Sequence, residues 1–374
     1  MVNSRERVKA VVEMRMPDVV PTDMWGSASR VHNDLYAELL SILNINDPGD
    51  LIRPGQVTSY ENYELSDALG CDFRHINPGK PDGFKSYKDE KGLVYDEWGI
   101  GRDYSAMYPT IAMFPLEGAG EADIKNHKWP DMKDEGRVRG LAAKAKNYYE
   151  NTDKAITATA ATSGLFFELG QFLRGPENFL MDMALNEKFV HALFDKLLEL
   201  FIEQNLNYLE PIASYIEWVE FTSDLGTQNG PFFSIEMFRT FYKEPYRQLF
   251  SAVKKAYPHV KIFYHCCGGI YDFIPDLIDV GVDILNPIQP LATGMDPGRI
   301  KSEFGDVLVF HGAIDIQGAM RGTIKDVRDE VRLRIEQMGY GGGYIVSPNN
   351  HLLPDIPPEN VICLYRYAKE YGVY

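Results

Sequence analysis

Short apolar runs alternate with amphipathic stretches through the second half of the chain. The runs predict buried strands at 155–162, 216–224, 261–267, 284–288, 308–314 and 344–348. Between and after them, apolar residues recur at helical spacing, which predicts helices at 175–208, 234–257, 270–280, 297–304, 323–338 and 357–371. Strands that alternate with helices indicate a parallel sheet with right-handed crossovers.

The first part of the chain is less regular but completes this pattern. A helix is predicted at 5–14, a first strand at 19–25 and a helix at 34–43. The glycine-containing, alternating segment 92–104 predicts a hairpin outside the repeat. Strand 19–25 and one further strand within 46–110 raise the number of strand–helix units to eight. Eight units predict an α/β fold of the (β/α)8 TIM-barrel type, with an N-terminal helical extension and an inserted hairpin.

The sequence disfavours two other architectures, an open doubly wound sheet and a two-domain chain. An open doubly wound sheet would bind a dinucleotide after an early strand, but no GxGxxG motif occurs there. No internal repeat, linker or low-complexity tract indicates a second domain. We therefore expect residues 1–374 to form one barrel domain.

The composition limits the kinds of molecule that the protein can bind and the cellular compartment in which it works. The formal charge of −16 argues against a nucleic-acid surface and against acidic membranes, which both require a basic field. The four cysteines include an adjacent pair and form no disulfide framework, which favours a reducing cytoplasm. The amino-terminal MVNSRERVKAVVEMRMPD lacks the apolar core of a signal peptide, and no apolar stretch has membrane-spanning length. We expect a cytoplasmic protein with a small-molecule substrate.

Polar residues gather where the predicted strands end. In TIM barrels the functional side chains lie at the carboxyl ends of the strands. The corresponding residues here are Asp23 and Trp25, Ser163, Asp224, His265 and Cys267, Gln289, and His351. Any one of them has an ordinary structural explanation, because Asp and Asn also cap helices. Their recurrence at one predicted rim favours a shared site.

His265 and Cys267 give this rim its most specific chemistry. Side chains alternate along a strand, so these two point the same way and Cys266 points away. Imidazole and thiolate are zinc ligands, and a catalytic zinc keeps one position open. Asp224 and His351 are the candidates for the third and fourth ligands. Without metal, Asp224 and His351 could do general acid–base work beside a substrate.

The chain resembles the uroporphyrinogen decarboxylase superfamily, which also contains zinc-dependent, corrinoid-linked methyltransferases. The resemblance rests on HCCGGIYDFIPDLIDVGVDILNPIQPLATGMDP, on NSRERVKAVVEMRMPDVVPTD, and on YDEWGIGR, LRGPENFLMDMALN, DLGTQNGPFFSIEMFR, FHGAIDIQ and PPENVICLYRYAKEYG. It covers nearly the whole chain. It implies an (α/β)8 barrel with an active-site cleft at the carboxyl ends of the strands.

Two motifs separate the branches of that superfamily. The decarboxylases carry an arginine-rich RQAGR-type motif after strand one, whereas residues 23–27 here read DMWGS, with Arg30 following. Without those guanidinium groups a polycarboxylate is poorly neutralised. The methyltransferases carry His-x-Cys, which His265 and Cys267 match. Their third ligand, a Cys, is replaced here by Asn350, so either His351 supplies the missing ligand or there is no zinc and His351 contacts the substrate.

The resemblance therefore implies a methyltransferase of the corrinoid-dependent type. It would move a methyl group between a small methylated substrate, methoxylated aromatic or methylamine-type, and a corrinoid on a partner protein, with zinc assisting. Asp23, Trp25, Ser163 and Gln289 are the predicted substrate contacts. The aromatic residues Trp25, Phe166, Phe167 and Tyr344 suit an apolar substrate or are ordinary packing.

Two alternatives stay open. A decarboxylase acting on a tetrapyrrole would need carboxylate-binding arginines elsewhere on the rim, for which Arg102 and Arg174 are candidates. A non-catalytic barrel that only binds a tetrapyrrole or corrinoid would need no metal, and changing His265 would have little effect.

Overall fold

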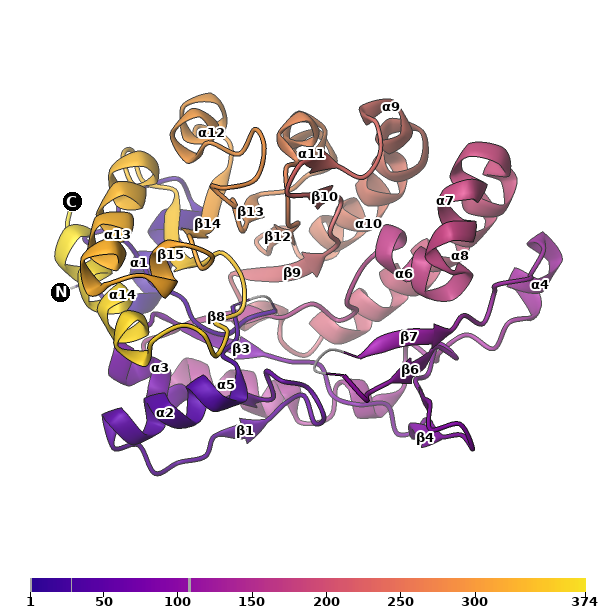
Figure 1. Ribbon diagram of the computed structural model, residues 1–374, viewed down its shortest axis with the longest axis horizontal. Helices are drawn as coiled ribbons and strands as arrows, with labels where there is room; N and C mark the ends of the chain where they lie inside the picture. The colour runs from indigo at the N-terminus through magenta and orange to yellow at the C-terminus, as the bar shows by residue number, and fades with distance from the viewer. Residues whose placement is uncertain (1, 28, 107–108) are drawn as a thin grey trace.

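The protein is a curled parallel sheet surrounded by helices, as seen in a computed structural model that describes residues 2–27, 29–106 and 109–374 (Figure 1). The sheet has seven strands in the order β15-β14-β13-β12-β9-β8-β3. They are β3 (Phe73–Ile76), β8 (Ala155–Ala158), β9 (Trp218–Thr222), β12 (Lys261–His265), β13 (Ile284–Asn286), β14 (Val309–Ile314) and β15 (Tyr344–Pro348). Nearly every strand residue is buried, as expected for a parallel sheet covered by helices. This confirms the six strands predicted in the second half of the chain.

The segment around Thr22 occupies the eighth position and closes the barrel. Thr22 pairs in parallel with Val346 of β15. On its other side, its carbonyl accepts a hydrogen bond of 2.9 Å from the backbone N–H of Asp72, which precedes β3. The sequence predicted a full strand at 19–25, but Pro21 has no N–H to donate and Trp25 has a φ of +86°. The segment therefore pairs only locally.

Helices connect successive strands and cover the outside of the sheet (Figure 1). Between β3 and β9 they are α4 (Glu121–Asn126), α5 (Leu141–Asn151), α6 (Phe166–Arg174), α7 (Pro176–Leu185) and α8 (Glu187–Leu209). After β9 they are α9 (Ile235–Met237), α10 (Lys243–Ala256), α11 (Ile274–Val280), α12 (Pro297–Phe304), α13 (Ile324–Met338) and α14 (Pro358–Tyr371). Within the part of the chain that the structure describes, none of the helices is both long and apolar enough to traverse a bilayer.

Helix α1 (Ser4–Val12) closes the amino-terminal end of the barrel. Asn3 and Glu6 form a capping box at its start. Its Val8, Val11 and Val12 pack against the inward side chains of seven strands: Phe73, Ala155, Trp218, Phe263, Ile284, Val309 and Ile345. The predicted N-terminal helix is confirmed, and it acts as a plug. The opposite, carboxyl end of the barrel is left for the site.

Two further segments lie outside the repeat. Helices α2 (Asn33–Leu43) and α3 (Tyr63–Leu69) flank the short pair β1 (Asp50–Leu51) and β2 (Tyr60–Glu61). The predicted hairpin at 92–104 is confirmed as β5 (Val94–Tyr95) and β6 (Gly101–Asp103). These belong to a four-stranded antiparallel sheet with β4 (Tyr87–Lys88) and β7 (Thr110–Met113).

Candidate metal centre and substrate pocket

Three side chains converge at the carboxyl ends of β9 and β12. His265 is the last residue of β12, and its Nε2 lies 3.4 Å from the Sγ of Cys267. Asp224 follows β9, and its Oδ1 lies 3.5 Å from the same Nε2. One ligand atom from each of the three residues lies within 4.8 Å of the other two. The strand alternation had predicted that His265 and Cys267 point the same way, and the structure brings Asp224 to them.

Asp224 is held in this position by the backbone around it. Its Oδ1 accepts a hydrogen bond of 2.8 Å from the backbone N–H of Cys267. Its own N–H donates to the Oε2 of Glu168 at 3.0 Å. The carboxylate remains partly exposed, with 40% of its side-chain surface accessible, so it can reach a ligand from the open side.

The Cys267 thiol is half-buried among polar side chains. Two amides contact its Sγ: Asn350 Nδ2 at 3.3 Å and Gln289 Nε2 at 3.5 Å. Burial, together with the negative charge of Asp224, raises the pKa of this thiol well above its ordinary value. Without a nearby cation the thiol stays protonated. Cys266 points away into the hydrophobic core, as predicted.

The ligand chemistry of this group fits zinc. Imidazole nitrogen, thiolate sulfur and carboxylate oxygen are the donors that zinc takes in proteins, and three protein ligands leave a fourth position for a water or substrate. A bound cation would also counter the negative charge that keeps the Cys267 pKa high. His265, Cys267 and Asp224 are therefore the residues that could hold the metal.

A cavity of about 730 Å³ opens beside these residues. His265 and Asp224 line one part of it, and Asn350 and His351 lie beside them. Its wall also carries apolar side chains, namely Ile52, Trp98, Ile100, Leu169 and Phe172. Its volume is that of a small-molecule site, and most of the rest of its lining is polar or charged, including Arg53, Glu168 and Gln204.

Glu168 is a pocket residue that the sequence did not reveal. It lies in the first turn of α6 and lines the cavity beside Asp224. Burial and the negative charge of Asp224 raise the pKa of its carboxyl to about 7. A carboxyl with such a pKa can give or take a proton near neutral pH. An acid in the first turn of a helix is common, so the pattern carried no signal that singled out Glu168.

The chain matches the uroporphyrinogen decarboxylase (URO-D) family over residues 102–371, which is more than half of its length. It belongs to the URO-D family. This confirms the superfamily that the sequence motifs had indicated.

Individual relatives are distant. The uroporphyrinogen decarboxylase of Chlorobaculum parvum is 27% identical over 130 residues, and that of Rickettsia felis 28% over 136 residues. These matches cover 34% and 36% of this chain and 35% and 37% of the relatives, so the chain spans about a third of the length of the curated relatives it matches. A solved methyltransferase from Methanosarcina mazei is 17% identical, with a TM-score of 0.66 over 99% of both chains. That likeness shows a shared fold.

His351 lies in the pocket of this URO-D family member but outside the group of three. Its Nδ1 accepts a hydrogen bond of 3.0 Å from the backbone N–H of Arg30. Burial and the positive charges of Arg53 and Arg30 lower its pKa to about 3, so the ring is neutral and its hydrogen sits on Nε2. In this arrangement Nε2–H is a donor to the pocket. The prediction of a His351 metal ligand stays a prediction, and the contact with Cys267 is made by Asn350.

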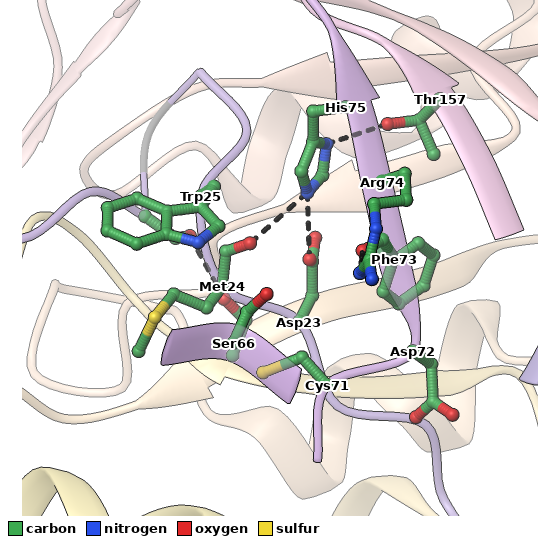
Figure 2. A network of polar contacts seen from close by, with 12 residues as sticks. Asp23, Met24, Trp25, Ser66, Cys71, Asp72, Phe73, Arg74, His75 and Thr157 are labelled. Carbon is green, nitrogen blue, oxygen red and sulfur yellow. Dashed lines mark hydrogen bonds and ion pairs between the residues drawn. The ribbon is translucent and has the colours of Figure 1, made fainter. Parts of the chain in front are cut away.

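Asp23 and Trp25, two of the predicted substrate contacts, lie inside the URO-D barrel. Asp23 sits between two histidine rings, with His75 Nε2 at 3.0 Å and His311 Nε2 at 2.9 Å; Figure 2 shows its contact with His75. The Nε1–H of Trp25 donates to the carbonyl of Asn62 at 3.2 Å. Both side chains are buried, and neither is among the residues that line the cavity.

The other predicted residues divide between pocket and core. Ser163 lines the cavity, whereas Gln289 is buried and its Oε1 accepts from the backbone N–H of Gly268 at 2.9 Å. Phe166, Phe167 and Tyr344 are packed in the hydrophobic core, so their structural interpretation was the right one. The substrate contacts predicted for Asp23, Trp25, Ser163 and Gln289 stay predictions.

Of the two arginines named for the decarboxylase alternative, one lines the cavity and the other does not. Arg102 lines the cavity and pairs with Asp96. Arg174 is paired with Asp182 at 2.7 Å and donates to the backbone carbonyls of three residues. Its guanidinium is therefore already engaged in contacts within the protein. Arg53, which the sequence did not single out, lines the cavity, and burial with the positive charge of Arg30 lowers its pKa to about 9.

Proposed function

We propose that this protein is a corrinoid-dependent methyltransferase that uses zinc held by His265, Cys267 and Asp224. It would move a methyl group between a small methoxylated aromatic or methylamine-type substrate and the corrinoid of a partner protein. The observation that carries the proposal is the convergence of imidazole, thiol and carboxylate, of which the imidazole and the carboxylate line a substrate-sized cavity. The bound metal would supply a Lewis acid at that wall.

The protein's own residues would bind the substrate and handle its proton. The apolar wall at Trp98 and Phe172 suits an aromatic ring. His351 presents Nε2–H to the pocket as a hydrogen-bond donor. When a methoxyl group loses its methyl to the reduced corrinoid, the carbon–oxygen electron pair stays on oxygen and the acceptor supplies the pair for the new bond. The leaving oxygen then needs one proton, which Glu168 can hold because its pKa is about 7.

Elemental analysis of the purified protein tests the metal site. We expect near-stoichiometric zinc in the wild type and loss of zinc in His265→Ala and Cys267→Ala. Cys363→Ala is the matched control, because Cys363 is buried in the core cluster on α14. Absence of zinc from wild-type protein expressed with added zinc would exclude this mechanism.

Activity is then tested with methoxylated aromatics and methylamines against a chemically reduced corrinoid, following its methylation by absorbance. Wild type and Cys363→Ala should methylate the corrinoid, and Cys267→Ala should not. Activity of Cys267→Ala equal to that of wild type would contradict the proposed role of the zinc site.

One observation favours the decarboxylase as a second candidate. Arg53 lines the cavity and forms no ion pair within 4.0 Å among residues 2–27, 29–106 and 109–374. A substrate carboxylate could pair with its guanidinium. Decarboxylation of uroporphyrinogen by the wild type, lost in Arg53→Gln and kept in Cys267→Ala, would favour this function over methyl transfer.

A further inference from the structure

A continuous line of hydrogen bonds crosses the barrel interior and ends at the proposed zinc site. Asp23 Oδ2 lies 2.9 Å from His311 Nε2, and His311 Nδ1 lies 2.8 Å from Asn286 Nδ2. Asn286 Oδ1 lies 2.5 Å from His265 Nδ1. We name these four residues the Asp23–His265 line. All four are buried, with at most 7% of their surface exposed.

The Asp23 end of the line is a fixed negative charge. Burial alone would raise the pKa of Asp23, but the positive charge of His75 and hydrogen bonds from both histidines lower it below its ordinary value. Burial alone would likewise lower the pKa of His75, and the charge of Asp23 raises it instead. An ionised carboxylate only accepts hydrogen bonds. His311 must therefore donate from Nε2.

Asn286 has one orientation in this line. Its Nδ2 faces two atoms of His311, the ring Nδ1 at 2.8 Å and the backbone carbonyl at 3.2 Å. A carbonyl can only accept, and the Nδ1 of a neutral imidazole protonated at Nε2 also accepts. The amide nitrogen is therefore on the His311 side, and the amide oxygen Oδ1 faces His265.

The last bond decides which nitrogen of His265 is free. Asn286 Oδ1 accepts, so His265 Nδ1 carries the hydrogen and Nε2 keeps its lone pair. That Nε2 faces Cys267 Sγ at 3.4 Å and Asp224 Oδ1 at 3.5 Å. If the line ran in the opposite direction, His265 would carry its hydrogen on Nε2, where a metal would have to bind. A metal needs the nitrogen that has no hydrogen.

We infer that Asp23, through His311 and Asn286, holds His265 in the tautomer that can bind a metal at Nε2. Asp23, His311 and Asn286 are positioning residues in this scheme, and the inference rests on the zinc site proposed above. It also gives the buried Asp23 a role at the site although it does not line the pocket.

The tautomer can be measured directly in the metal-free, full-length protein. With 15N-labelled histidine, the His265 ring signals are assigned by their loss in His265→Gln. We expect wild-type His265 to be protonated at Nδ1 and unprotonated at Nε2. Asp23→Asn should shift His265 toward the Nε2–H form and weaken zinc binding about 10-fold or more in chelator competition. An Nε2–H form in the wild type, or no change in the folded variant, would overturn the inference.

A pair of substitutions at Asn286 keeps the test decisive if Asp23→Asn unfolds the barrel. Asn286→Asp retains an oxygen acceptor facing His265 and should keep the Nδ1–H tautomer. Asn286→Leu removes that acceptor and should lose the tautomer preference, with zinc affinity about 10- to 100-fold lower. Equal tautomer populations in the two variants would contradict the inference.

Thr157→Val is the matched control for a general effect of disturbing the network. Thr157 Oγ1 contacts His75 Nδ1 at 2.7 Å, which lies beyond Asp23 and off the line (Figure 2). This variant should leave the His265 tautomer unchanged, and a shift as large as that of Asp23→Asn would overturn the inference. A wild type that binds no zinc would refute the proposed function, while the tautomer would still be read in the metal-free protein.

Discussion

At the scale of single residues, the carboxyl group of Glu168 is set apart by its surroundings in the pocket. Burial and the negative charge of Asp224 raise its pKa to about 7. In the unfolded chain its pKa is near the ordinary 4.5. The folded protein therefore holds this proton more tightly than the unfolded chain does. Stability must then fall as the pH rises from about 4.5 to about 7.

Glu168→Gln should remove this pH-dependent loss. At pH 8 the variant should be more stable than the wild type, by at most about 3.5 kcal/mol, because one pKa unit corresponds to about 1.4 kcal/mol. At pH 5 the two proteins should differ little. Urea unfolding at both pH values measures the difference, and exposed Glu90→Gln is the control. A gain that is the same at both pH values would show that Glu168 is not the titrating group.

At the scale of elements, the backbone at Cys267 and Gly268, which follows β12, packs closely against a neighbouring hairpin. The hairpin consists of β10 (Gly226–Thr227) and β11 (Gly230–Pro231). Gly268, the residue after Cys267, has a φ of +91°, and a Cβ there would come closer than 3.0 Å to the backbone of Gly226 and Thr227. Backbone atoms cannot swing aside, so a side chain at 268 must push the two loops apart.

Gly268→Ala should therefore destabilise the protein and lower its zinc content. The left-handed backbone conformation alone costs about 1–3 kcal/mol for a residue with a side chain. The clash with the hairpin adds to this cost and displaces Cys267. Gly230→Ala is the matched control, because Gly230 also has a positive φ, of +135°, but has open space around its Cβ position. Equal effects of the two variants on unfolding and zinc content would exclude the clash.

At the scale of the whole molecule, Asp72 joins the plug helix to the segment that closes the barrel. Its Oδ1 accepts hydrogen bonds of 2.7 Å from Ser4 and from Arg7 of α1. Its Oδ2 accepts from the backbone N–H of Thr22 at 2.9 Å. Thr22 in turn pairs with β15, so one buried carboxylate connects α1, the closing segment and the start of β3.

Asp72→Ala should destabilise the barrel by about 2 kcal/mol, because it leaves the backbone N–H of Thr22 and the Ser4 hydroxyl without their acceptor, while Arg7 keeps its ion pair with Asp18. Thermal or urea unfolding measures the loss. Asp329→Ala, which removes an exposed ion pair to Lys325 on α13, should cost no more than about 0.5 kcal/mol. A similar small effect of both substitutions would contradict the closing role of Asp72.

Local sequence patterns were sufficient for the strands and for two residues of the site. Alternation along β12 predicted that His265 and Cys267 share a side, since a strand fixes that relation within three residues. Local sequence patterns did not predict that Glu168 and Asn286 belong to the site. These residues reach the site from α6 and β13, and no periodicity within one element records what a side chain in another element contacts. For the same reason, the sequence did not show that Arg30 binds the Nδ1 of His351.

The sequence by itself determined the alternation of strands and helices, the barrel class, the superfamily and the His265–Cys267 pair, because all of these follow from short-range periods and motifs. Only the tertiary structure decided that Asp224 joins that pair and that Asp23 lies inside the barrel between two histidines. It also decided the direction of the hydrogen bonds that end at His265. These relations join residues up to 288 positions apart, and they depend on how the barrel closes and how deeply each group is buried.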